Sequence, residues 1–242
     1  MEETKKKGLN TSSNAYTIIY SVVIVVIVAF LLAFVSSTLK PQQDENVALD
    51  KKKQILASLN IRDIDGAEAT DTYNKVIVAD EIIDRDGNVK EKGEQGGTKA
   101  GFKCTSADTK KGDLALYVCN VDGETKYVIP VYGMGLWGGI SGYIAINADR
   151  QTVYGAYFNH ESETAGLGAE IKDSRAWQDQ FKGKHIFAQG KEGVALSVVK
   201  SSDKTDPTTQ CDAVTGATLT SNGVSDMLQT CLSDYTKFLT SK

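Results

Sequence analysis

The sequence predicts an α+β protein: a single N-terminal transmembrane helix followed by a domain of mainly antiparallel strands with flanking helices. Three features predict it: a long uncharged segment near the N-terminus, short strand-like segments in the middle, and a strong helical periodicity at the C-terminal end. Segregated strands and helices are typical of α+β domains. A length of 242 residues, with 41% hydrophobic and 24% charged residues, excludes a disordered chain and a disulfide-stapled miniprotein.

The uncharged segment predicts a membrane anchor. No charged residue occurs between Gly8 and Leu39, and residues 15–39 are almost wholly apolar. As a helix, this segment would cover about 37 Å, which exceeds a hydrocarbon core of about 30 Å. A cleaved signal peptide is the alternative, but its apolar region typically has only about 7 to 15 residues. The segment has no acidic, basic or histidine side chain, so it predicts no ion pathway.

Lysines flank the anchor on both sides, Lys5 to Lys7 before it and Lys40 and Lys51 to Lys53 after it. Charge alone therefore leaves the orientation open. A short lysine-bearing tail before a long apolar segment is typical of an uncleaved signal anchor. We therefore expect residues 1–14 in the cytoplasm, residues 15–39 in the membrane, and the body of the protein outside.

The body is acidic, because the chain after Lys40 holds all but four of the 27 basic residues and all but two of the 31 acidic ones. Such a surface repels phosphodiester backbones, so nucleic-acid binding is excluded. The four cysteines have an even count that fits two disulfides, and four buried thiols are the alternative. They form no CxxC motif, and His160 and His185 lie far apart in the sequence, so no metal site is expected.

The body begins with an expected juxtamembrane helix over residues 48–59, after a polar exit from the membrane at residues 41–47. Residues 90–99 contain three glycines and predict a mobile loop. A short helix is expected from Asp173 or Ser174 to Phe181. Strands are expected at residues 76–78, 82–83, 114–118, 127–131, 142–148, 152–158, 185–188 and 194–199.

The C-terminal segment has the strongest periodicity of the chain. Apolar residues recur at helical spacing: Val224, Met227, Leu228, Cys231, Leu232, Tyr235, Phe238 and Leu239. This pattern predicts one buried face of an amphipathic helix, with Thr220 or Ser221 as its N-cap.

The segment that precedes this helix, Asp212 to Ser221, combines small residues, hydroxyls and one glycine. Unpaired backbone amides and the positive end of the helix dipole make such a turn a potential phosphate site. A threonine there could hold a phosphate noncovalently or be esterified by one. A capped helix start without a ligand is the alternative from the residues alone.

Asp212-Ala213-Val214-Thr215-Gly216-Ala217-Thr218 resembles the flavinylation motif of the FMN-binding domain family. The resemblance implies that a flavin transferase joins Thr218 through a phosphoester to the phosphate of FMN, one per chain. Thr215, Gly216 and Ala217 would then contact the cofactor. Thr215 replaces the more common serine, which also offers a hydroxyl.

A second stretch, from Gly135-Leu136-Trp137-Gly138-Gly139 to Glu163-Thr164-Ala165-Gly166-Leu167-Gly168, is similar to the signature of the C-subunit family of sodium-translocating NADH:quinone reductases. Ala165 departs from this signature, which usually has proline there. Trp137, Glu163, Thr164, Leu167 and Gly168 are the expected flavin-lining residues, although Trp137 and Leu167 could instead be core. Glu161 and Glu163 alternate, which argues against a paired-carboxylate acid/base site.

The resemblance covers nearly the whole chain. It implies an electron-carrying subunit of a six-subunit sodium-pumping complex in a bacterial inner membrane. Residues 40–130 would form the first part of the body, and residues 131–242 would form the FMN-binding core. No catalytic residue is expected, and no dinucleotide fingerprint occurs, so NADH would be oxidised elsewhere. The corresponding subunit of an Rnf-type ferredoxin:NAD reductase and a flavin-free anchored scaffold are the alternatives.

Overall fold

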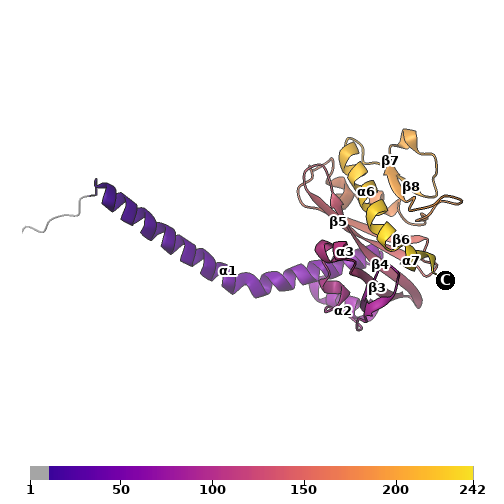
Figure 1. The fold of residues 1–242 in the computed structure, drawn as a ribbon, viewed down its shortest axis with the longest axis horizontal. Helices are drawn as coiled ribbons and strands as arrows, with labels where there is room; N and C mark the ends of the chain where they lie inside the picture. Colours follow the sequence, from indigo (N-terminus) through magenta and orange to yellow (C-terminus); the bar gives the residue numbers. More distant parts are fainter. Residues whose placement is uncertain (1–10, 242) are drawn as a thin grey trace, which may run out of the picture. The chain divides into compact units, whose positions relative to one another are not determined.

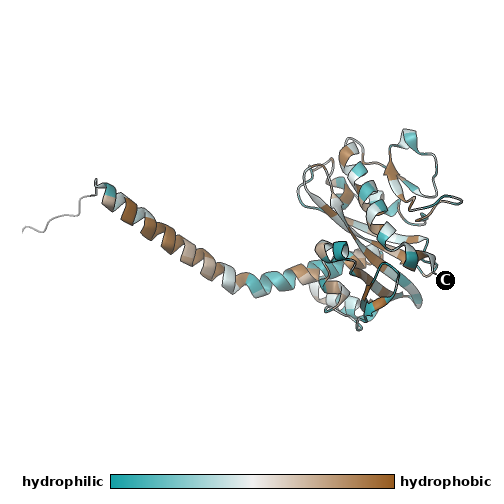
Figure 2. Cartoon of the chain, viewed as in Figure 1, coloured by the Kyte–Doolittle hydropathy of each residue, from teal (hydrophilic) through white to brown (hydrophobic). Residues whose placement is uncertain are grey.

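The computed structural model describes residues 11–241, which form two compact units that divide between Ala48 and Leu49. Tail residues 1–10, part of the expected cytoplasmic segment 1–14, lie outside the described residues. The first unit consists of most of helix α1 (Asn14–Ser58), whose strongly apolar stretch is brown in Figure 2. This helix is long and apolar enough to cross a membrane, as predicted.

Helix α1 continues without a break through residues 41–47, so the prediction of a polar exit followed by a separate helix is wrong. Pro41 lies inside the helix, where it removes one backbone donor at a cost of about 3 kcal/mol. Gln42, Gln43 and Glu45 follow it, and such residues favour helices. The end of α1 belongs to the second unit, where Ile55 and Leu56 are fully buried.

The second unit contains one antiparallel six-stranded sheet in the order β2-β1-β3-β4-β5-β6 (Figure 1). This sheet confirms the predicted α+β class, and both residues 40–130 and residues 131–242 contribute strands to it. Its strands are β1 (Ile77–Ile83), β2 (Val89–Glu91), β3 (Leu114–Val121), β4 (Glu124–Met134), β5 (Gly139–Asn147) and β6 (Val153–His160). A separate parallel pair comprises β7 (Ser197–Val199) and β8 (Gln210–Asp212).

The helices of the second unit are mostly short. They are α2 (Gly66–Val76), α3 (Ser106–Lys111), α4 (Glu170–Asp173), α5 (Arg175–Asp179), α6 (Thr218–Asp234) and α7 (Thr236–Thr240), with 3-10 turns at Gly101–Lys103 and Ser201–Asp203. Ser174 caps α5 by accepting from the Trp177 amide at 3.3 Å, as predicted. The segment 185–188 forms only isolated bridges, of which Phe187 pairs with Val194.

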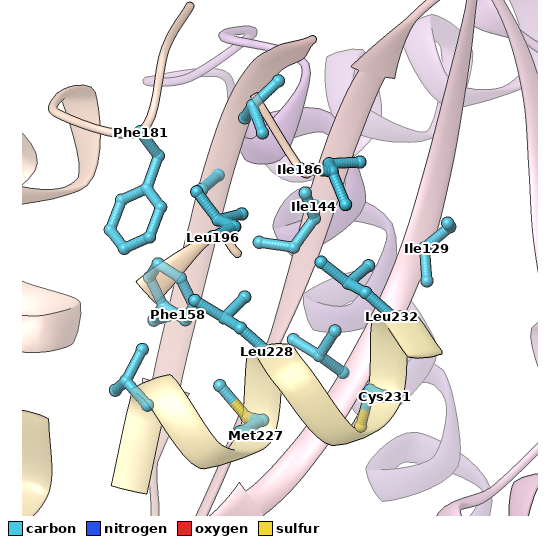
Figure 3. Close-up of a cluster of buried hydrophobic side chains, with 14 of the residues drawn as sticks. Ile129, Ile144, Phe158, Phe181, Ile186, Leu196, Met227, Leu228, Cys231 and Leu232 are labelled. Atoms are coloured by element: carbon cyan, nitrogen blue, oxygen red, sulfur yellow. The ribbon is translucent and has the colours of Figure 1, made fainter. Parts of the chain in front are cut away.

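Helix α6 covers one face of the sheet and closes the main core (Figure 1). Its side chains Met227, Leu228 and Leu232 point toward strand residues such as Ile129 and Ile144 (Figure 3). All eight apolar residues of the predicted helical face are buried, as the periodicity predicts, but they belong to two helices and not to one, because α6 ends at Asp234 and α7 begins at Thr236. Alternate residues of each strand face the other side of the sheet, where Tyr117 contacts Tyr143 edge to face.

The segment predicted as a mobile loop, residues 90–99, is instead fixed by a buried carboxylate. Asp80 on β1 is 1% exposed and accepts from the amides of Lys99, Ala100 and Phe102 at 3.0 to 3.2 Å. A Cβ on Gly97 would lie only 1.6 Å from its Oδ1. The glycines therefore let the chain wrap closely around Asp80.

The four cysteines are free and buried, which corresponds to the buried-thiol alternative. Burial raises the pKa of each thiol, and that of Cys211 to about 12. Protonated, inaccessible thiols are poor nucleophiles, so these cysteines act as packing residues.

Candidate functional site

Three segments that are distant in sequence meet at one end of the six-stranded sheet. They are the β4–β5 turn (Gly135–Gly138), the loop after β6 (residues 161–169), and residues 213–217 with the first turn of α6. Glu163, in the loop after β6, accepts hydrogen bonds from Trp137 in the β4–β5 turn and from Thr220 in the first turn of α6, and so joins the three segments. The structure therefore brings together all the candidate residues that the sequence predicted.

The β4–β5 turn is tight and presents an exposed indole. Its closing bond runs from the Gly135 amide to the Gly138 carbonyl at 2.8 Å. The Ser162 hydroxyl donates to the Trp137 carbonyl at 3.0 Å, and Gly138 leaves room for that hydroxyl. The Trp137 side chain is 67% exposed, so the alternative that it is a core residue is wrong.

The loop after β6 is closed by hydrogen bonds between its own backbone groups. The Thr164 carbonyl accepts from the amides of Leu167 and Ala169 at 3.1 and 3.0 Å, and Gly166 adopts a φ of 72°. Thr164 and Ala165 are exposed. Leu167 is 43% exposed, so it too lies at the surface and not in the core.

Helix α6 begins at Thr218, earlier than predicted, and its N-cap is Ala217. The prediction of Thr220 or Ser221 as the N-cap is wrong, because both side chains lie buried in the first turn with partners of their own. Thr220 donates to Glu163 Oε2 at 2.5 Å, and Ser221 Oγ accepts from the Val214 amide at 3.1 Å. Ala217 has no side-chain acceptor, so the helix start lacks a side-chain cap.

The hydroxyls of this segment fall into two classes. Thr220 and Ser221 are buried and bonded, whereas Thr215 is exposed and Thr218 is half-buried. Within residues 11–241, the Thr215 and Thr218 hydroxyls have no hydrogen-bond partner. Gly216 lies between them in the chain with a φ of 79°, a backbone conformation that disfavours any side chain, and a Cβ there would lie 2.9 Å from Leu167 Cδ2. Thr218 is therefore the free hydroxyl at the first position of a 17-residue helix.

Glu163 lies beneath the site and not on its surface. It is 7% exposed, and its Oε1 accepts from the Trp137 amide at 2.8 Å. Burial alone would raise the pKa of this carboxyl, but hydrogen bonds from Thr220 and the amides of Trp137 and Leu136 hold the pKa below its usual range. Glu163 is consequently an ionised internal acceptor.

Apolar side chains surround the start of α6 at the surface. Leu219 is 59% exposed directly after Thr218, and Met134 and Leu136 are 68% and 47% exposed beside Trp137. An open cleft of about 490 Å³ adjoins the loop after β6 and the segment before α6, lined among others by Gly166, Trp177 and Thr215. The site can therefore offer a polar helix start and an apolar surface to one ligand.

The sequence did not single out Met134, Leu136, Leu219 or Thr220 as site residues. Leu219 directly follows the motif threonine, so its position was a usable signal. No local signal identifies Thr220, because its partner Glu163 is 57 residues away in the chain.

The histidines serve local structure. His160 Nδ1 accepts from the Glu163 amide at 3.2 Å, and His185 lies on another part of the domain, beside Thr152. Residues 11–241 contain no group of three His, Cys, Asp or Glu side chains placed to hold a metal ion.

Comparison with known proteins connects this geometry to one group. The family model of the FMN-binding domain matches residues 135–233, which include all three segments of the site. The C subunit of the Na⁺-translocating NADH-quinone reductase of Vibrio campbellii is 30% identical over 81% of this chain and 82% of that protein. The same subunit of Haemophilus ducreyi is 34% identical over 77% of each.

A solved structure agrees with these matches. The crystal structure of the C subunit of the Na⁺-translocating NADH-quinone reductase from Parabacteroides distasonis superposes with a TM-score of 0.76 at 37% identity. The match covers 84% of this chain and 98% of that chain. The fold and the sequence therefore lead to the same relatives.

Proposed function

The chain belongs to the family of Na⁺-translocating NADH-quinone reductase C subunits, and from this premise we propose that it relays single electrons through FMN esterified to Thr218. The members of this family are subunits of an oxidoreductase complex, and residues 135–233 of the chain match an FMN-binding domain. The chain's own contribution is to hold the cofactor and to anchor it at the membrane.

The free hydroxyl of Thr218 at an uncapped helix start is the observation that carries the proposal. The first amides of a helix lack intrahelical partners, and the helix dipole adds positive potential there. No side chain satisfies those amides from the N-cap position, because that residue is Ala217. A phosphate ester on Thr218 would place its oxygens at these donors.

The other hydroxyls of the segment are poorer acceptors of a flavin. Thr220 and Ser221 are buried, and their oxygens are already engaged with Glu163 and Val214. Thr215 is exposed but lies in the loop before Gly216, away from the first helical position. Position and availability together favour Thr218.

The apolar surface around Thr218 suits the ring system of FMN. Trp137, Leu167 and Leu219 offer flat or aliphatic surfaces that are exposed without a ligand, and aromatic rings stack favourably on an indole. When bound, FMN supplies the electron-carrying chemistry, because it can take up and release electrons one at a time. The side chains hold the ring and exclude water from one of its faces.

The long apolar helix α1 would hold this carrier at the membrane. In the proposed arrangement, the N-terminal tail is cytoplasmic, the FMN-binding domain is periplasmic, and the partners are the other subunits of a six-subunit pump in the inner membrane. A covalent bond would prevent loss of the cofactor outside the cytoplasm. A flavin transferase would act on the domain during maturation.

The test is in-gel flavin fluorescence of the denatured full-length protein after coexpression with a flavin transferase. We expect fluorescence from the wild type, none from Thr218→Ala, and undiminished fluorescence from the matched control Thr230→Ala, which changes an exposed threonine of the same helix outside the motif. Thr218→Ser keeps a hydroxyl and should retain part of the signal. Normal fluorescence from folded Thr218→Ala protein would refute the proposed attachment site.

A further inference from the structure

The side chain of Glu163 is the point at which the three segments of the site are joined. Its Oε1 accepts from the Trp137 amide at 2.8 Å, and its Oε2 accepts from Thr220 Oγ1 at 2.5 Å. A buried charge is costly unless it is hydrogen-bonded, and bonds to an ionised acceptor are among the stronger ones.

Two glycines leave the space that this carboxylate occupies. A Cβ on Gly135 would lie 2.4 Å from Glu163 Oε1. A Cβ on Gly168 would lie 2.4 Å from Oε2 and 2.7 Å from Thr220 Oγ1. Neither glycine has a positive φ, so the close approach itself, and not the backbone conformation, disfavours a side chain. The β4–β5 turn and the loop after β6 are both shaped around one side chain.

The groups that Glu163 binds are neighbours of the groups that would face the flavin. Thr220 is the third residue of α6, in the same turn as Thr218. The Trp137 amide belongs to the residue whose indole is exposed beside the site. The carboxylate therefore fixes the first turn of α6 relative to the β4–β5 turn, although it is buried itself.

We propose that Glu163 is the positioning residue of the flavin site, and that its bonds to Thr220 and to the Trp137 amide set how the ring of FMN lies against the Trp137 indole. This inference rests on the proposed function, because it assumes a flavin on Thr218. It assigns Glu163 a role different from direct contact with the flavin.

The test uses flavin fluorescence, which an indole in contact with the ring quenches by electron transfer. The full-length flavinylated protein is purified in detergent, and its fluorescence is divided by that of the same sample after denaturation, which corrects for flavin content. We expect Trp137→Phe to raise this ratio several-fold. Thr220→Val removes the donor to Glu163 and should raise it similarly, whereas Thr220→Ser should retain the wild-type ratio.

The double variant Thr220→Val/Trp137→Phe distinguishes positioning from a general loss of stability. If Glu163 and Thr220 act by placing the indole, the double variant should show no higher ratio than Trp137→Phe alone. Additive increases, or a Thr220→Val protein that melts earlier but keeps the wild-type ratio, would overturn the proposal. Glu163→Ala should raise the fluorescence ratio as much as Thr220→Val does. If Glu163→Ala does not fold, Thr220→Val alone still tests the proposal.

A second readout is independent of the flavin. The chain has two tryptophans, so Trp137 is the sole tryptophan in a Thr218→Ala/Trp177→Phe background, and excitation at the red edge of the absorption band selects it over the tyrosines. Adding Thr220→Val to this background should increase the fast component of the Trp137 fluorescence anisotropy decay. An unchanged decay would refute the positioning role. Absence of covalent flavin from the wild type would instead refute the proposed function.

Discussion

Asp80 and Glu163 are two buried carboxylates that organise loops in the same way, in regions of opposite character. Asp80 is 1% exposed and Glu163 is 7% exposed, and each accepts hydrogen bonds from backbone amides. A Cβ on Gly97 would collide with the Asp80 carboxylate, and a Cβ on Gly135 or Gly168 would collide with that of Glu163. The difference lies in what the organised loop leaves at the surface.

The loop around Asp80 exposes polar residues, such as Glu94 and Lys99, and buries Phe102. The site around Glu163 exposes Trp137 and Leu219 instead. Apolar side chains gathered at a surface are unusual in a domain that folds alone and mark a binding region. A buried carboxylate with close glycines therefore identifies a fixed loop, whereas surface composition distinguishes a binding site from a structural loop.

The largest expected effect on stability is at the structural loop. Asp80→Ala leaves several buried amides without an acceptor, at about 1 to 3 kcal/mol for each such donor. We expect a total loss of about 3 to 5 kcal/mol, and a melting temperature lower by about 10 °C. Circular dichroism of the full-length protein in detergent measures this, with exposed Asp71→Ala as the control. Unchanged melting of Asp80→Ala would show that Asp80 does not hold this loop in place.

Gly168 and Gly166 are required for different reasons: Gly168 because neighbouring atoms leave no room for a side chain, and Gly166 because of its positive φ. The methyl group of Gly168→Ala would overlap the Glu163 carboxylate and the Thr220 hydroxyl. We therefore expect the free energy of unfolding to fall by about 2 to 3 kcal/mol. Gly166 has a φ of 72°, and no atom lies within 4 Å of the position that a methyl group would occupy, so Gly166→Ala should lose only about 1 kcal/mol. Thermal melting compares the two variants. An equal or smaller loss for Gly168→Ala would contradict the packing argument.

The acid sensitivity of the site is the smallest expected effect. The folded-state pKa of Glu163 is lowered, so its stabilising contribution is full above the unfolded pKa of about 4.3 and is lost as the pH falls through the folded pKa. Glu163→Gln should therefore melt earlier than the wild type at pH 7, and this difference should shrink below about pH 4. Melting curves from pH 7 to pH 3 measure it. A constant difference would show that the charge contributes nothing.

Local patterns predicted five of the six strands of the large sheet and the C-terminal helical face, but not helices α2 and α3 or strands β2 and β8. The buried face of α6 and α7 could be predicted because helical periodicity is a property of neighbouring residues, and its apolar residues from Val224 to Leu239 are buried as expected. The continuous helix through Pro41 was not predicted, because a proline before polar residues resembles a helix end. The loop on Asp80 was not predicted either, because its bonds join residues about 20 positions apart.

The candidate site could be located from its motifs but not built from them. The motifs named Thr218, Trp137 and Leu167, and the structure places them in adjoining segments. They did not indicate that Glu163 is buried, because that depends on Thr220, which is distant in sequence. They also placed the helix start too late, because Thr220 and Ser221 have the hydroxyls of an N-cap but use them for other contacts.

The mass of one peptide tests the central claim most directly. Trypsin should release residues 205–237 of the full-length protein, coexpressed with a flavin transferase, as one peptide containing both Thr215 and Thr218. We predict that this peptide is heavier by FMN less one water, and that fragmentation places the added mass on Thr218. An unmodified peptide from flavin-containing protein, or a modification on Thr215, would contradict the account.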